Sequence, residues 1–295
     1  RYTIISRIGM GGQGTVYLAQ DHKATTTHGT DNRHEKRASE PGSEAVSEIA
    51  LKREGLNEVV LKEFLLPVFP DTRVRKAAAI KFQEEADLLG KLEHPQIVKF
   101  YELFLEDHRA YLVLEKLDGV TLKDHVESQG SLPPDAIEDL ARQMCLILQY
   151  LHNQTPPVVH RDFTPDNLIL GDDGQLKLLD FSVAQSVTSN VTGSVVGKPH
   201  YIAPEQFRGK SCSQSDIYSM GATLYFLATG KQPEPITNLK LAYEESSSSS
   251  NFDLAKDAKA NKKSQTKLSK IIEKSTKLDL GNRYKKVEEI LQDLG

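Results

Sequence analysis

The sequence predicts an α+β protein in which a strand-rich half containing one long helix precedes a helix-rich half. Three observations support this prediction. Short β-branched and alternating runs dominate the first part of the chain, and the apolar period becomes helical over residues 73–92. After Gly119, apolar residues recur mainly at helical spacing, and no internal repeat interrupts the pattern.

Composition limits the classes of protein that need to be considered. The chain has 295 residues, with 38% hydrophobic and 26% charged residues, as expected for one large or two small globular domains. Its net charge of −4 predicts no nucleic-acid partner, and the absence of a run of about eighteen apolar residues predicts no membrane contact within this chain. Cys145 and Cys212 fit neither a disulfide framework nor a zinc site, which favours reduced thiols in the cytoplasm.

The first half should contain a small sheet. We expect strands at Tyr2–Ile8, Thr15–Leu18 and Val59–Phe64, with Gly9 to Gly14 breaking the first two apart. Residues 20–57 are polar and irregular, so we interpret most of them as a surface insertion. Further strands are expected at Ile97–Phe104 and Ala110–Glu115.

The long helix of the first half should span Arg73–Leu92. Glu85 falls on its apolar face, and a carboxylate that points inward needs a cation, because an unpaired buried charge is costly. The apolar face itself is formed by Ala78, Phe82, Leu89 and Leu92.

The second half shows four helical segments and another insertion. An apolar stripe follows Pro133-Pro134-Asp135, and Asp216–Gly230 is apolar on almost every side, as in a helix buried at a domain centre. Residues 243–264 contain a run of serines and are interpreted as a low-complexity insertion. From Thr266 a further stripe follows, and a short helix is expected at Val287–Leu294.

Two features of the first half suggest phosphate chemistry. Glycines at positions 9, 11 and 14 would let backbone N–H groups approach phosphate oxygens, although a tight hairpin explains them equally well. Lys62 lies in an apolar strand, where its ammonium either reaches solvent or pairs with Glu85. The pair would hold a cation beside the glycine loop.

The segment "VVHRDFTPDNLIL", residues 158–170, is more specific. Asp162 can accept a hydroxyl proton, and Asn167 with Asp180 offers the hard oxygen ligands that Mg²⁺ prefers. Each residue taken singly is explained by a turn. Their joint spacing, behind a glycine loop and a strand lysine, favours a catalytic site.

With these motifs in order, the chain resembles a protein kinase of the eukaryotic-like Ser/Thr type found in bacteria. The resemblance implies a bilobal fold, with an antiparallel-sheet N-lobe over residues 1–115 and a mainly helical C-lobe over residues 116–295. The matching motifs are Gly9-x-Gly11-x-x-Gly14-x-Val16, Val59-Val60-Leu61-Lys62, His160-Arg161-Asp162 with Asn167, Asp180-Phe181 and Ala203-Pro204-Glu205, with Asp216 and Arg283 as large-lobe anchors.

The resemblance implies an enzyme that uses ATP and Mg²⁺, with Mn²⁺ as the alternative metal, to phosphorylate Ser/Thr hydroxyls of protein substrates. Lys62 with Glu85 and the base Asp162 would be catalytic, Asn167 and Asp180 would bind the metal, and Arg283 would pair with Glu205. The residues implied to contact the nucleotide are Ile8, Gly9, Gly11, Gly12, Gly14, Val16, Val60, Lys62, Glu115, Leu117 and Ile169, with Leu114 as gatekeeper.

Two departures from the family pattern are correlated. Thr164 stands where the catalytic loop normally has Lys, and Lys198 stands where the activation segment normally has Thr. We hypothesise that Lys198 places its ammonium near the γ-phosphate while Thr164 hydrogen-bonds Asp162; the alternative is an exposed Lys198 that faces acidic substrates. Ser182 replaces the glycine after Asp180-Phe181, which we expect to bias that motif without abolishing activity.

The activation segment, Ser182 to His200, is expected to be autophosphorylated, at Thr192 first and Ser194 second, with Arg161 pairing the phosphate. Self-association would permit this in trans. A pseudokinase scaffold, a small-molecule kinase and tyrosine specificity are the alternatives. Because the chain begins at Arg1 and enters a strand at once, we interpret it as a domain of a longer protein, cytoplasmic or the cytosolic part of a membrane-anchored one.

Overall fold

The computed structural model divides the chain into two compact units, which are described separately. The first unit comprises Arg1–Glu93 and Val98–Lys116, and the second comprises His94–Ile97 and Leu117–Gly295. Most of both predicted insertions, Gly12 and the predicted phosphorylation sites lie outside the described residues. The structure describes residues 1–11, 14–22, 58–65, 80, 83–107, 109–181, 185–186, 197–236 and 262–295.

The first unit is built on a five-stranded antiparallel sheet in the order β1-β2-β3-β5-β4. The prediction that the glycines break the first strand is wrong, because β1 continues through Gly11 and pairs there with Gly14. The second strand also runs further than expected, to Asp21, which pairs with Tyr2. The strands are β1 Tyr2–Gly11, β2 Gly14–Asp21, β3 Glu58–Leu65, β4 Phe100–Glu106 and β5 Arg109–Glu115.

Alternation along β3 sends Lys62 and Glu63 to opposite faces of the sheet. Glu63 shares its face with Val59 and Leu61, which belong to an apolar cluster. Its buried carboxylate forms an ion pair with Arg109 and accepts hydrogen bonds from the hydroxyls of Tyr17 at 3.0 Å and Tyr111 at 3.1 Å. Burial raises the pKa of the Glu63 carboxyl, but these hydrogen bonds and the charge of Arg109 outweigh burial and lower the net pKa below the ordinary value of 4.5.

This cluster predicts a pH dependence of stability. A carboxyl whose pKa is lowered on folding stabilises the protein above its unfolded pKa, and the stabilisation is lost as the pH falls through its folded pKa. We expect Glu63→Gln to make the free energy of unfolding depend less steeply on pH in the acid range. Urea unfolding at pH values on both sides of 4.5 measures this slope. The exposed Glu84→Gln variant is the control, and an unchanged slope for Glu63→Gln would contradict the prediction.

The long helix of the first unit is described only in part. Residues 83–89 are helical, and the turn at 90–91 ends the helix before Leu92, so the predicted C-terminal boundary was too late. Ala86 and Leu89 are buried, and Glu85 is buried on the same side, as the apolar pattern predicted. Ala78 and Phe82 lie outside the described residues.

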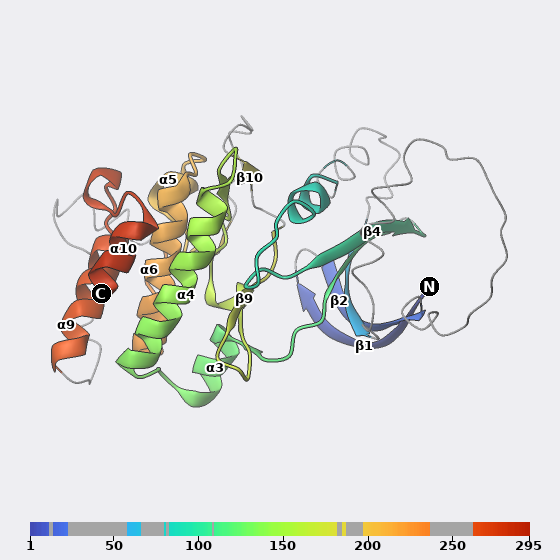
Figure 1. Cartoon of the computed structure of the whole chain (residues 1–295), viewed down its shortest axis with the longest axis horizontal. Coiled ribbons are helices and arrows are strands. Elements are labelled where there is room, and N and C mark those ends of the chain that lie inside the picture. The colour runs from blue at the N-terminus through green and yellow to red at the C-terminus, as the bar shows by residue number, and fades with distance from the viewer. Residues whose placement is uncertain are drawn as a thin grey trace, which may run out of the picture. The chain divides into compact units, whose positions relative to one another are not determined.

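In the second unit, α4 contacts three other helices. This helix packs against α6, α9 and α10, which run beside it in Figure 1. Leu268, Ile271 and Ile272 are the buried residues of α9 that the sequence pattern indicated. The elements of this unit are β6 Val120–Thr121, α3 Leu122–Gln129, α4 Pro134–His152, β7 Val158–Val159, η2 Pro165–Asn167, β8 Leu168–Leu170, β9 Leu176–Leu178, β10 Gln185–Ser186, α5 Pro204–Phe207, α6 Ser213–Thr229, α9 Lys262–Ser275, η3 Leu280–Asn282 and α10 Val287–Leu294.

One short segment departs from the simple division of the chain. The sequence predicted a strand from Ile97, but β4 begins at Phe100, and Ile97 instead forms an isolated parallel bridge with Leu178 of β9. The carbonyl of Gln96 accepts a hydrogen bond of 2.8 Å from the Leu178 amide. The residues before β4 are therefore held by the small sheet of the second unit.

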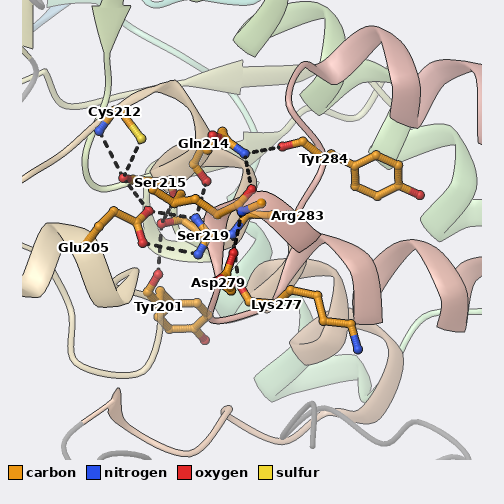
Figure 2. A network of polar contacts seen from close by, with 12 residues as sticks. Tyr201, Glu205, Cys212, Gln214, Ser215, Ser219, Lys277, Asp279, Arg283 and Tyr284 are labelled. Atoms are coloured by element: carbon orange, nitrogen blue, oxygen red, sulfur yellow. Dashed lines mark hydrogen bonds and ion pairs between the residues drawn. The ribbon is translucent and has the colours of Figure 1, made fainter. Parts of the chain in front are cut away.

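A buried ion pair links α5 to the loop before α10. Arg283 donates to both carboxylate oxygens of Glu205, at 2.7 and 3.2 Å, as predicted. Figure 2 shows that the hydroxyl of Ser215, at the start of α6, also points to Glu205, with a hydrogen bond of 2.7 Å. The pair and this hydrogen bond thus join α5 and the start of α6 to Arg283, which lies 78 residues after Glu205.

Candidate active site

Lys62 is the main polar residue among the predicted site residues of the first unit. It lies in the middle of β3, where it pairs with Val16 on one side and Leu112 on the other. Its Nζ is 3.5 Å from Oε1 of Glu85, and both side chains are buried. The predicted pairing is present, because the buried glutamate and the buried lysine each remove the cost of the other's charge.

The glycine segment lies beside this lysine in the sheet. Val16 pairs with both Gly9 and Lys62, so the β1–β2 hairpin lies beside the strand position of Lys62. Gly14 has a φ of 149°, and a Cβ there would lie 1.9 Å from the Glu63 carbonyl oxygen. Only glycine permits that approach of the two strands. Ile8, in the same hairpin, is 54% exposed.

The predicted adenine-contacting residues fall in both units. Val60 lies in β3 opposite Leu114, which is buried, and Glu115 ends β5. The Glu115 amide donates a 2.9 Å hydrogen bond to the Lys99 carbonyl. Leu117 begins the long part of the second unit, and Ile169 lies in β8 of that unit.

The catalytic loop of the second unit is anchored by Asp216, which is buried in α6. Its Oδ2 accepts a hydrogen bond of 2.9 Å from the His160 amide, and its Oδ1 accepts one of 2.8 Å from the Arg161 amide. Arg161 has a φ of 70°, a left-handed conformation that is costly for a non-glycine residue. Asp216 therefore fixes a strained turn directly before Asp162.

Asp162 and Asn167 meet as the sequence spacing indicated. The Asn167 Nδ2 donates to both the carbonyl and the Oδ2 of Asp162, each at 2.8 Å. The other carboxylate oxygen, Oδ1, is buried and has no hydrogen-bond partner among the described residues. Burial raises the pKa of the Asp162 carboxyl, and the charge of Lys198 is the largest influence that opposes this rise.

Asp180 lies at the end of the segment after β9. It has a φ of 41°, a second left-handed residue in this region, and its charge contributes to the raised pKa of Asp162. Phe181 is buried against His160, with ring centroids 4.9 Å apart in an edge-on arrangement. The motif is thus packed onto the catalytic loop and its acid lies near Asp162.

Thr164 and Lys198, the exchanged residues, are in contact. The Lys198 ammonium donates to the Thr164 hydroxyl at 3.1 Å and pairs with Asp166 Oδ2 at 2.9 Å. The predicted hydrogen bond from the Thr164 side chain to Asp162 is not among the contacts of the described residues; the Thr164 backbone amide donates to the Asp162 carbonyl instead, at 2.9 Å. The hydroxyl faces the ammonium, which is the stronger partner for its lone pair.

Sequence reasoning missed two members of this charge cluster. Asp166 bridges two lysines, because its Oδ1 lies 3.3 Å from the Nζ of Lys123 in α3. Burial raises the pKa of the Asp166 carboxyl, but the two ammonium groups outweigh burial and lower it overall. Asp166 was visible within "TPDN", whereas no local pattern indicated Lys123, since it belongs to another element.

Comparison with known proteins identifies the class. A family model described as "Protein kinase domain" matches residues 42–294. The chain belongs to the protein kinase domain family, and the predicted α+β kinase fold is confirmed.

The chain is also similar to bacterial proteins that are named as serine/threonine kinases. The "Serine/threonine-protein kinase PrkC" of Bacillus subtilis is 30% identical over 301 aligned residues, which cover 100% of this chain and 40% of the relative. The "Probable serine/threonine-protein kinase PknB" of Lactococcus lactis is 27% identical, with 100% of this chain and 41% of the relative covered. The "Serine/threonine-protein kinase PknB" of Mycobacterium leprae is 33% identical over 52% of this chain and 26% of the relative.

The chain therefore spans about two fifths of the length of the first two of these relatives. Within the residues that the structure describes, we find no helix with the length and apolar character needed to cross a bilayer.

Proposed function

We propose that this chain is an active serine/threonine protein kinase domain that transfers the γ-phosphoryl group of ATP to protein hydroxyls. The observation that carries the proposal is the state of Asp162, with Oδ2 held by Asn167 and a buried Oδ1 that has no partner among the described residues. An unpaired buried acceptor is costly, so it is expected where a ligand supplies the partner. A substrate hydroxyl is such a ligand.

In the proposed reaction, the hydroxyl oxygen forms a bond to the γ-phosphorus while the bond from that phosphorus to the β–γ bridging oxygen breaks. The hydroxyl proton passes to Asp162, and ADP leaves with the electron pair of the broken bond. Lys62, held by Glu85, binds the α- and β-phosphates. The names of the relatives support serine and threonine as the acceptors.

The residues proposed to hold Mg²⁺, with Mn²⁺ as the alternative, fit a hard cation. Asn167 uses its Nδ2 for Asp162, which leaves its amide oxygen available, and Asp180 adds a carboxylate. Among the described residues no group of three His, Cys, Asp or Glu side chains is arranged to hold a metal. A site of two protein oxygens completed by substrate phosphates is the usual Mg²⁺ arrangement, and the metal would neutralise phosphate charge there.

The nucleotide contacts are proposed from the positions of the residues in their elements. Glycines 9, 11 and 14 belong to the β1–β2 hairpin, while Val16 and Val60 lie on adjacent strands next to Lys62. We propose that the backbone of Glu115 and Leu117 meets adenine, and that Ile169 contacts its ring. Gly12 and Ile8 complete the set.

A pseudokinase scaffold is the alternative from another class. It has no need for Lys62, Asp162, Asn167 and Asp180 together, and the named relatives do not favour it. The two free cysteines are compatible with the proposed cytoplasmic location. Protein substrates, autophosphorylation of residues 182–200 and self-association to achieve it are part of the same proposal.

The test is transfer of label from γ-labelled ATP, with Mg²⁺ or Mn²⁺, to the protein itself or to a generic basic protein. We expect phosphoserine and phosphothreonine in the products. The Lys62→Met variant should bind ATP more weakly and transfer more slowly, because the buried Glu85 carboxylate loses the Lys62 charge and the phosphates lose a cation.

The exposed Lys91→Met variant, in the same unit, is the matched control and should behave as the wild type. Binding of ATP with no transfer by the wild-type protein under either metal would favour the pseudokinase alternative. Label on tyrosine alone would overturn the proposed acceptor.

A further inference from the structure

The ammonium of Lys198 is held against the catalytic loop by two contacts. It donates to Thr164 Oγ1 at 3.1 Å and pairs with Asp166 Oδ2 at 2.9 Å. Thr164 is buried, whereas the Lys198 side chain keeps 36% of its surface exposed. A lysine has three N–H donors, so two partners leave one donor available to a ligand.

The backbone around Lys198 is also fixed to the catalytic loop. Gly197 has a φ of 117°, and a Cβ there would lie 3.1 Å from the Arg161 carbonyl oxygen. The side chain of Gln206 donates to that same carbonyl at 2.5 Å. After Lys198, its own carbonyl accepts hydrogen bonds from the amides of Tyr201 at 2.9 Å and Ile202 at 3.0 Å. The Lys198 side chain therefore extends from a hydrogen-bonded turn.

The positive charge of Lys198 acts on the carboxyl of Asp162, the proposed base. Among the groups that oppose the effect of burial on the Asp162 carboxyl, Lys198 is the largest, ahead of His160 and the Asn167 hydrogen bond. The ammonium is held on the loop that carries the proposed base, and in phosphoryl transfer negative charge spreads over three equatorial oxygens. A preorganised donor aimed at that charge lowers the barrier.

We infer that Lys198, delivered by the activation segment, contacts the γ-phosphoryl group during transfer, with Thr164 orienting its ammonium. The inference rests on the proposed function and adds a catalytic residue to it. During transfer the bonds are those given above: oxygen to γ-phosphorus forms, phosphorus to bridging oxygen breaks, the proton goes to Asp162, and Lys198 stays protonated throughout. Lys198 and the turn that begins at Gly197 both contact the catalytic loop, which places the cation there.

The test is a double-mutant cycle made of Thr164→Lys, Lys198→Thr and the two substitutions combined. We expect Lys198→Thr to lower kcat about 100-fold, the usual cost of removing one transition-state donor. Thr164→Lys places two ammonium groups in contact and should also lose activity, because like charges repel at this distance. The combined variant again has one cation and one hydroxyl, and should recover most of the wild-type rate. Losses that simply multiply in the combined variant would overturn the inference.

A binding measurement separates this inference from the proposed function. We expect Lys198→Thr to weaken binding of a non-hydrolysable ATP analogue about tenfold, as for one charge-assisted hydrogen bond, with the Kd for ADP unchanged and Mg²⁺ present in both titrations. This result can be obtained even if the wild type transfers no phosphate, in which case the proposed function fails while the contact between Lys198 and the γ-phosphate is still established. Equal weakening of both ligands would contradict a γ-phosphate contact.

Lys123→Met is the matched control. It removes the other lysine from Asp166, at 3.3 Å, and among the described residues Lys123 makes no contact with Thr164. We expect it to retain the wild-type ratio of the Kd for the ATP analogue to the Kd for ADP. If it changes that ratio as strongly as Lys198→Thr does, the effect comes from the Asp166 ion pairs and the inference is wrong. Thermal melting of every variant establishes that each is folded.

Discussion

The Asp162→Asn variant is expected to bind ATP normally and to transfer its γ-phosphoryl group about 10²- to 10⁴-fold more slowly than the wild type. The amide keeps an acceptor for the Asn167 side chain, which donates to Asp162 Oδ2 at 2.8 Å, so the loop should stay in place. It cannot take a proton from the substrate hydroxyl. Single-turnover transfer with saturating ATP measures the loss directly, and titration with ADP measures nucleotide binding.

The control for this variant is Asp172→Asn. Asp172 is exposed in the turn after β8, ten residues after the proposed base Asp162 in the sequence, and has no part in the proposed site. It should transfer phosphate at the wild-type rate. A fully active Asp162→Asn protein would show that Asp162 is not the general base, whatever the role of its neighbours.

The helices of the second unit could be predicted closely because a buried helix face requires apolar residues at helical spacing, and that pattern is visible in the sequence. The segment Asp216–Gly230 is apolar on nearly every side, and α6 runs from Ser213 to Thr229 with Gly230 as its left-handed cap, at a φ of 71°. The last helix, α10, has the predicted bounds Val287–Leu294. Local pattern and tertiary environment agree in these elements.

Boundaries in the sheets were less predictable because distant partners set them. The run Ile97–Phe104 is mostly apolar, but Ile97 bridges Leu178 while β4 starts at Phe100. The glycines that suggested a break after Ile8 are instead accommodated by pairing of Gly11 with Gly14. In each case the deciding contact lies in another strand, which periodicity cannot identify.

The contacts at the site also divide into those that the local sequence predicts and those that only the fold brings together. The pairing of Lys62 with Glu85 was predictable because a carboxylate on an apolar face requires a cation, and the strand lysine was available. The contact of Lys198 with Asp166 was not, since the hypothesis aimed that lysine at phosphate and gave it no protein partner. Lys123 completes the cluster from α3, and only the fold brings it there.

The buried ion pair between Arg283 and Glu205 should contribute the largest single effect on stability. Arg283 is almost fully buried, donates to both oxygens of Glu205, and also donates to the carbonyls of Gln214 at 2.8 Å and Lys277 at 3.0 Å. Figure 2 shows these groups converging on the guanidinium. Breaking such a pair from one side leaves an uncompensated buried charge.

We therefore expect Glu205→Gln to lower the free energy of unfolding by about 3–5 kcal/mol, and Arg283→Met to lower it by a similar amount. Arg283→Lys should not rescue stability, because an ammonium cannot reach two carboxylate oxygens and two carbonyls in the plane that the guanidinium provides. Urea unfolding followed by circular dichroism measures each value. The exposed pair of Lys277 with Glu273, 2.8 Å apart, supplies the control, since Glu273→Gln should cost less than about 1 kcal/mol.

Combining Arg283→Met with Glu205→Gln distinguishes a charge effect from a packing effect. With both charges gone, no buried ion lacks a counter-charge, so the combined loss should be clearly smaller than the sum of the two single losses. Strict additivity would mean that each side chain stabilises the fold through its own separate contacts, among them the Ser215 hydroxyl on Glu205 and the Tyr218 ring beside Arg283. A non-additive cycle would instead assign the stability to the ion pair that ties α5 to the loop before α10.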